Sequence, residues 1–313
     1  MNPISSRNGT NNSNETVLAQ LTVRKASLDQ SQLAISTGKR INKVSDDPVG
    51  AAQAERAMTR IERIKVDLRA IDLQRSSMTL AESTLGEGID DLQRVRELLV
   101  SASNATLDTP QRAGIVHEIQ SLRHRLLQLA NRQDSNGMAL FGGLGSVATP
   151  FVEDGTGVVS FVGVAGLPAT SDVSVPMALD GHSAFMFTPD HGPNASIFKA
   201  MDTAIAALKG PANNPTTLAA LSGAISQGIK DIDTGLTQLQ MARGQAGVFL
   251  NQSDRMESLL NARHDQSETD RSRVQDLDMA QAISQMQSHQ IAYEIALKTY
   301  AQSRQLSLFN VLN

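Results

Sequence analysis

The sequence contains no cysteine, and this absence excludes several kinds of site. Without thiols the chain can form no disulfide, no thiolate metal site and no cysteine nucleophile. Long apolar runs are also missing, since no stretch approaches the roughly 18 consecutive apolar residues that suggest a membrane-spanning helix. Residues 1–15 are rich in Asn, Ser and Thr and lack the apolar core of a signal peptide. We therefore expect a mobile polar tail, no membrane association, and any export to use a route without a cleaved signal peptide.

Aromatic side chains and net charge are scarce as well. The chain has no Trp, its aromatic content is 3%, and its formal net charge is -4. Small-molecule pockets and compact cores depend on aromatic area, and nucleic-acid-binding domains usually carry a clear basic excess. The composition argues against a pocketed enzyme and against a nucleic-acid partner. We therefore expect no catalytic residue, no cofactor and no metal.

The apolar residues that are present form a heptad pattern at both ends of the chain. These positions are Val17, Leu21, Leu28 and Ile35 near the start, and Met279, Ile283, Met286, Tyr293, Leu297 and Tyr300 near the end. So narrow a seam needs a partner helix, and a repeat of about 3.5 residues is typical of a coiled coil. The simplest partner for each end is the other end, which predicts paired terminal helices. We further hypothesise that these helices become ordered only on assembly.

Longer helical patterns fill the region between the two ends. The expected helices span residues 15–36, 48–104, 109–136, 194–208 and 216–260, and a last helix begins at Asp276 or Asp278 after a polar stretch at 264–273. Asp47 and Pro48 suit a helix start, because a carboxylate caps the first turn and proline fits the first helical position. The apolar stripes of residues 61–99, 218–260 and 110–133 are expected to pack on one another.

Residues 138–193 differ in composition, being rich in Gly, Val, Phe, Thr and Pro. Short strands are expected at 157–163 and 171–175. Because long helices flank this segment, we predict a mainly α fold with a β-rich insertion: a long antiparallel helical bundle or coiled coil whose termini pair at one end. The expected domains are a terminal coiled-coil domain (1–44 and 274–313), a helical bundle domain (45–137 and 194–273) and a small β-rich outer domain (138–193).

Two short motifs suggest chemistry only weakly. Residues 143–148 match a dinucleotide-binding fingerprint, but that site needs a helix directly after it, and Thr149-Pro150 follow instead. His117 and His124 lie seven residues apart, whereas metal ligands on a helix favour an i, i+4 spacing. We interpret the first as a glycine-rich turn and the second as histidines at the edge of a bundle.

Three segments resemble the flagellin superfamily of bacterial flagellar proteins. They are Ser36–Ile41 with Ser45–Pro48, then Leu92–Val100, then Ser272–Ala280, and they occur in the order expected of that family. The resemblance covers residues 16–137 and about 216–313. Within the superfamily, Pro48, Leu140–Gly143 and Leu306–Phe309 are more similar to hook–filament junction proteins than to flagellins. The polar segment before Glu15 is longer than in either group.

The resemblance implies a structural, non-enzymatic subunit of the extracellular flagellum that forms a junction ring and adapts hook to filament. The implied partners are further copies in the ring, a neighbouring hook-associated protein on the hook side, and flagellin or second junction subunits on the filament side. An export chaperone at the C-terminal region is also implied. The terminal helices would line an inner tube, and we assign their assembly interface to Val17, Leu21, Leu28, Ile35, Ile283, Met286, Ile291, Leu297 and Leu308.

Two further groups of residues follow from the same resemblance. The turn and helix-start motif consists of Gly38, Arg40, Asp46, Asp47 and Pro48, and the bundle-domain subunit contacts are Arg94, Glu97 and Leu98. A short flagellin that forms the filament itself is the alternative within the family. A coiled-coil signalling or adaptor protein would share the heptads but would not account for the three family segments together.

Overall fold

The computed structural model describes residues 4–103, 108–145, 147–167, 176–187, 195–211 and 214–312, with side chains described between 15 and 302. The elements are α1 (Ile4–Thr37), α2 (Pro48–Ala102), α3 (Thr109–Ala130), β1 (Phe151–Glu153), β2 (Val159–Phe161), α4 (Gly181–Phe185), α5 (Ile197–Lys209), α6 (Pro215–Gln275) and α7 (Met279–Leu312). Internal contacts divide the chain into a terminal unit (1–64 and 262–313) and a central unit (65–261). The three-domain division expected from the sequence stays a prediction.

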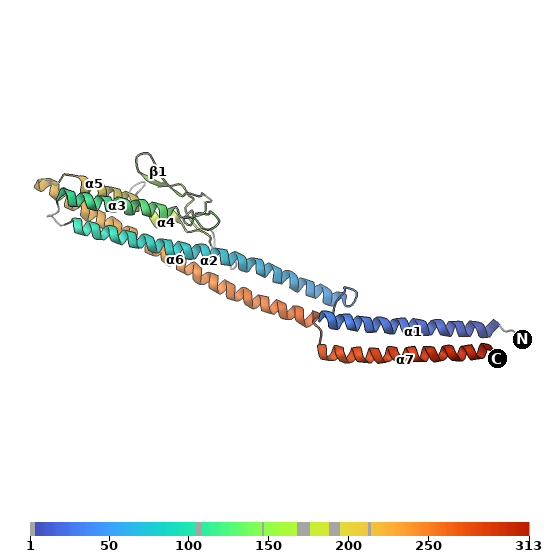
Figure 1. Ribbon diagram of the computed structural model, residues 1–313. Coiled ribbons are helices and arrows are strands. Elements are labelled where there is room, and N and C mark those ends of the chain that lie inside the picture. The colour runs from blue at the N-terminus through green and yellow to red at the C-terminus, as the bar shows by residue number, and fades with distance from the viewer. Residues whose placement is uncertain are drawn as a thin grey trace. The chain divides into compact units, whose positions relative to one another are not determined.

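In the terminal unit, α1 and α7 pack side by side with the two chain ends together (Figure 1). Gly38 ends α1 with a φ of 67°, in the left-handed region that glycine adopts easily. The segment after α1 then pairs with the segment before α7: the Arg40 N–H donates to Gln275 O at 2.8 Å, and the Leu277 N–H donates to Gly38 O at 3.0 Å. The mainly α fold with paired terminal helices is therefore confirmed.

The central unit is built on the antiparallel pairing of α2 and α6. Glu82 of α2 meets Arg243 of α6 at 2.6 Å, and Arg96 meets Asp233 at 2.7 Å, so residue numbers rise on one helix as they fall on the other. α3 packs on α2, since Leu126 lies against Gly88, and α5 lies along α3. Large aliphatic side chains on α2 and α3 are fully buried: Leu85, Leu92, Leu99, Ile119 and Leu126. Within this unit, the predicted packing of the apolar stripes is confirmed.

The β-rich segment of the central unit is small and is held by phenylalanine. β1 and β2 form an antiparallel pair in which Phe151 stands opposite Phe161. Phe141, Phe151, Phe161, Phe185 and Phe198 form a cluster whose ring centroids lie 5.2 to 6.2 Å apart. The few aromatic residues of the chain are thus concentrated here, where short strands bury little surface. The strand expected at 157–163 is present as β2 but spans only Val159–Phe161, and the one expected at 171–175 lies outside the described residues.

Several predicted helix boundaries were wrong. α1 begins at Ile4, so the polar segment expected to be a mobile tail is helical along α7. Tertiary pairing with α7 overrides the weak helix propensity of Asn, Ser and Thr. α6 continues to Gln275 through the polar stretch at 264–273. There Arg271 lies 2.8 Å from Glu268, an i, i+3 pair that supports a solvated helix.

The end of α3 also differs from the prediction. The helix stops at Ala130, six positions before the Asn136-Gly137 turn. The side chain of Asn131 donates to Phe151 O at 2.8 Å and accepts from the Phe151 N–H at 2.9 Å. The side-chain amide of Asn131 therefore pairs with the backbone of β1 in the way that the backbone of a neighbouring strand would. This pairing directs the chain out of the helix. The predicted cap Asn194 lies outside the described residues, and Ser196 caps α5, accepting from the Lys199 N–H at 3.1 Å.

Candidate functional site

The paired helices α1 and α7 carry the predicted assembly interface. Val17, Leu21, Leu28, Ile35 and Met286 are partly buried, whereas Ile283, Ile291 and Leu297 are 42%, 57% and 40% exposed. The side chain of Leu308 lies outside the described residues. A pair of helices can cover only one face of each partner, so some apolar seam residues stay in contact with solvent. Their role in assembly stays a prediction.

The sequence reading missed a second set of exposed apolar side chains on the same helices. Leu18, Val23, Leu33 and Ile295 lie outside the heptad seam and are 48%, 66%, 44% and 59% exposed. Isolated exposed apolar residues are ordinary, but several of them on both helices of one pair are typical of a surface that contacts protein. Their signal in the sequence is the presence of apolar residues at positions that the heptad frame assigns to solvent.

The turn and helix-start motif is held together by local hydrogen bonds. Asp46 Oδ2 accepts from the backbone N–H groups of Asn42 and Lys43 at 3.1 and 2.9 Å. Asp47 Oδ1 accepts from the Gly50 N–H at 2.8 Å, which caps α2 as predicted. This bond, and then the bond from Arg40, lower the pKa of the Asp47 carboxyl below its ordinary value. Arg40 and Asp47 thus bond to each other, Gly38 ends α1, Asp46 holds the turn between the helices, and Pro48 begins α2.

The contacts of Arg40 and Gly50 explain why this turn requires these residue types. Arg40 Nη2 donates to Asp47 at 3.2 Å and to the Val274 carbonyl at 2.8 Å, so it joins the start of α2 to the end of α6. A Cβ added to Gly50 would lie 2.5 Å from Asp47 Oδ2 and 2.6 Å from Ile41 Cδ1. Gly50 is therefore required for the close approach of the turn, and sequence reasoning did not identify it.

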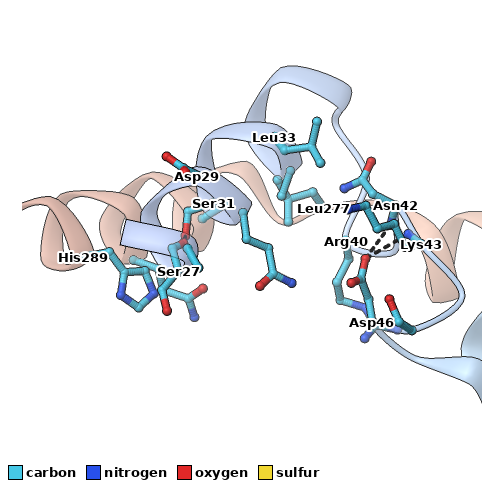
Figure 2. A pocket seen from close by; sticks show the side chains of 16 residues that line it. Ser27, Asp29, Ser31, Leu33, Arg40, Asn42, Lys43, Asp46, Leu277 and His289 are labelled. Atoms are coloured by element: carbon cyan, nitrogen blue, oxygen red, sulfur yellow. Dashed lines mark hydrogen bonds between the residues drawn. The ribbon is translucent and has the colours of Figure 1, made fainter. Parts of the chain in front are cut away.

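A polar cavity of about 640 Å³ opens between α1, this turn and α7. Figure 2 shows Ser27, Asp29 and Ser31 on one side, Arg40, Lys43 and Asp46 of the turn on another, and His289 of α7. The lining mixes acidic and basic groups, and several are already engaged within the chain. Asp29 pairs with Lys25 at 3.3 Å, and Asp46 binds its own turn. This arrangement is typical of a solvent-accessible polar groove at a junction between helices.

The predicted subunit contact of the bundle begins with Arg94, a half-exposed residue of α2 in the central unit. Arg94 Nε lies 2.7 Å from Glu118 of α3, and Nη1 lies 3.1 Å from Glu97. These bonds raise the pKa of Arg94, which is already high, and leave its side chain 50% exposed. Leu98 is only 6% exposed and belongs to the core of the unit. A contact to another subunit at this place would therefore use Arg94 and Glu97, and it stays a prediction.

The weak chemical motifs do not converge on a site. Gly143 and Gly145 sit in turns, and the next regular element after them is β1, with no helix opening at residue 148. His117 and His124 are both exposed on α3. Among the described residues, no group of three or more His, Asp or Glu is placed to hold a metal. Within the same residues, every helix is too short or too polar to span a membrane.

Comparisons with known proteins agree with this geometry. Residues 9–146 match the bacterial flagellin N-terminal helical region, and residues 229–312 match the bacterial flagellin C-terminal helical region. Flagellar hook-associated protein 3 of Escherichia coli is 30% identical over 300 residues, covering 88% of this chain and 90% of that protein. Bacillus subtilis flagellin is 28% identical, covering 87% of each.

A solved structure shows the same fold. Hook-associated protein 3 of Legionella pneumophila superposes with a TM-score of 0.62 at 19% identity, over 69% of this chain and 97% of that one. The regions matched by the two flagellin family models include most of α1, all of α7, the turn at 38–48 and the Arg94 segment. The chain therefore belongs to the bacterial flagellin family, together with flagellar hook-associated protein 3.

Proposed function

We propose that this protein is a structural subunit of the bacterial flagellum that forms the junction between hook and filament. The observation that carries the proposal is the match to E. coli flagellar hook-associated protein 3, which extends over 90% of that protein. The paired helices α1 and α7, with apolar side chains exposed along them, supply a surface that further subunits can cover. The relatives that support this function are structural proteins, so we propose no catalytic activity.

The proposed partners follow from a position between hook and filament. Copies of the chain would form a ring, which would contact a hook-associated protein on one side and flagellin or a second junction layer on the other. The protein would be extracellular and would reach this place by flagellar export, held beforehand by a chaperone at its C-terminal region. Arg94 and Glu97 are proposed to contact a neighbouring subunit through the bundle.

A short flagellin is the second candidate, since Bacillus subtilis flagellin matches at 28% identity over most of the chain. The two functions differ in the assembly of the purified protein. A flagellin subunit grows long filaments, whereas a junction subunit stops at short rings or stays monomeric. We expect no filaments by electron microscopy under conditions in which a known flagellin polymerises. Long filaments would contradict the junction function and support the flagellin function.

The subunit contact at Arg94 has its own test. Arg94→Ala should reduce motility and junction assembly while the circular dichroism of the subunit stays helical, because the side chain is half exposed and its partners are solvated. Arg69→Ala is a matched control, since Arg69 is exposed on the same helix and, among the described residues, bonds only to the Lys65 carbonyl. Normal motility of the Arg94→Ala strain would refute the proposed contact.

A further inference from the structure

A second cavity lies in the central unit, where α3 begins and α5 ends. Its volume is about 650 Å³, within the range of small-molecule sites. Val116 and Leu208, which are 3% and 2% exposed, form part of its wall, and Ala113 and Pro211 extend the apolar lining. The cavity is far in sequence from the turn at 38–48 and from the helices α1 and α7. None of its lining residues belongs to the predicted assembly interface.

Arg112 lines this cavity and is the one buried charge in its wall. The residue is 8% exposed, and its Nη1 donates to the Gly210 carbonyl at 3.3 Å. Its Nε is shielded from solvent and has no hydrogen-bond partner among the residues that the structure describes. Within the described part of the chain no carboxylate pairs with Arg112. A guanidinium has five N–H donors, and burying one without a counter-charge costs free energy. The single bond to Gly210 therefore satisfies only part of the hydrogen-bonding capacity of Arg112.

The other charged residue that lines the cavity is basic as well. Lys209 is exposed there, Thr109, His117 and Gln120 add polar side chains, and none of the lining residues is acidic. A wall that combines aliphatic side chains with an arginine and a lysine matches a ligand that has an apolar body and an anionic end. Arginine suits a carboxylate in particular, because its planar fork binds two oxygens at once.

We propose that this cavity binds a carboxylate carried on an apolar chain, with Arg112 as the residue that binds the anion. The apolar chain packs on Val116 and Leu208, and Lys209 adds a second positive charge at the mouth. Such a carboxylate can belong to a free organic acid or to an acidic peptide. The inference does not rest on the proposed role at the flagellar junction.

Calorimetric titration of the full chain tests the ligand chemistry. Hexanoate should bind with a stoichiometry near one, whereas hexan-1-ol, which lacks the charge, and acetate, which lacks the chain, should bind at least about tenfold more weakly. An N-acetylated Leu-Leu-Glu amide presents the same chemistry on a peptide. Tighter binding of the peptide or of hexanoate identifies the source, and binding of neither overturns the proposal. Raised salt should weaken binding, because Lys209 is exposed at the mouth of the cavity.

Variants test the role of Arg112. Arg112→Met keeps much of the volume and removes the charge, and we expect at least about a tenfold loss of hexanoate affinity. Arg255→Met is the control, because Arg255 is exposed on α6 and its one bond within the described part of the chain goes to the Asn251 carbonyl. If Arg112→Met fails to fold, the exposed Lys209→Gln should still weaken binding by about threefold. Hexanoate affinity that is equal in all folded variants overturns the proposal.

Discussion

Arg123 of α3 joins three elements of the central unit through one side chain. Its Nε lies 2.6 Å from Asp202 of α5, its Nη1 lies 2.8 Å from Glu153 of β1, and its Nη2 donates to the Gly157 carbonyl at 2.7 Å. The side chain is 11% exposed. Burial raises the pKa of Asp202, although Arg123 acts in the opposite direction. From the sequence, Arg123 is only a basic residue beside His124. Its role in joining these elements depends on three partners that are distant in sequence.

Arg123→Met should therefore destabilise the central unit. The variant leaves the partly buried carboxylates of Asp202 and Glu153 without their shared counter-charge, which we expect to lower the free energy of unfolding by roughly 2–3 kcal/mol. Urea unfolding followed by circular dichroism measures the change. Arg255→Met, an exposed arginine of α6, should stay within about 0.5 kcal/mol of wild type. A loss equal to that control would show that the network contributes nothing.

Asp134 stabilises the turn after α3 in a manner that depends on pH. Burial alone would raise the pKa of its carboxyl, but hydrogen bonds from the Met138 and Asn136 N–H groups and from Ser77 lower the pKa below its ordinary value of 3.8. A folded pKa below the unfolded one means that the stabilisation is complete above pH 3.8. It is lost as pH falls through the lowered value.

Asp134→Asn should consequently lower the Tm by about 2–4 °C at pH 6, for a loss near 1 kcal/mol. The difference from wild type should shrink as pH falls below 3.8, because wild type then loses the same charge. Scanning calorimetry between pH 2.5 and 6 measures it. Asp67→Asn on α2 is the control, since Asp67 has no hydrogen bond or ion pair in the described structure. A difference that is constant with pH would contradict the account.

At the scale of elements, small residues on α6 set how closely α5 approaches. A Cβ added to Gly235 would lie 2.8 Å from Ile197 Cγ1, and one added to Gly228 would lie 3.4 Å from Ala204 Cβ. Glycine normally weakens a helix interior, so its presence here is explained by packing. Gly244 of the same helix has nothing within 4 Å of its added Cβ.

Gly235→Ala and Gly244→Ala should therefore change stability in opposite directions. The first crowds Ile197 and should cost about 1–2 kcal/mol, because overpacking outweighs the gain in helix propensity. The second should add about 0.5–1 kcal/mol, since it meets only open space. Chemical denaturation of both variants gives the comparison. A stabilised Gly235→Ala would show that α5 is not packed tightly on α6.

The elements also show what the sequence could predict and what it could not. Long periodic helices were predictable, because α2, α6 and α7 repeat one apolar face over many turns. Asp47, Asp108 and Asp278 cap helices by local hydrogen bonds, and the first and last of these were expected. The end of α3 was not predictable, because Asn131 bonds to Phe151, 20 residues away. The cavity at Arg112 depends on α5 and α3 lying together, and no local pattern encodes that contact.

At the scale of the whole molecule, the paired helices α1 and α7 form a layer that consists of only two helices. They expose apolar side chains such as Val23 and Ile295, and each helix has a face that its partner does not cover. So thin a layer has little buried core of its own. We hypothesise that neighbouring subunits complete it, and that its stability in the free subunit is low.

Hydrogen exchange on the monomer measures this difference directly. Amides of residues 17–35 and 279–305 should exchange much faster than those of α2 and α6 in the central unit, and their protection should rise in assembled flagella. The central unit serves as the internal control, because its core is complete within one chain. Equal protection of both regions in the monomer would contradict the hypothesis.

Deletion of the gene in its own bacterium tests the central claim most directly. A junction subunit is needed to join filament to hook, so electron microscopy of the deletion strain should show intact hooks without filaments, and flagellin should accumulate in the medium. Restoring the gene should restore the filaments. Normal filaments on the hooks of the deletion strain would contradict the junction role proposed for this chain.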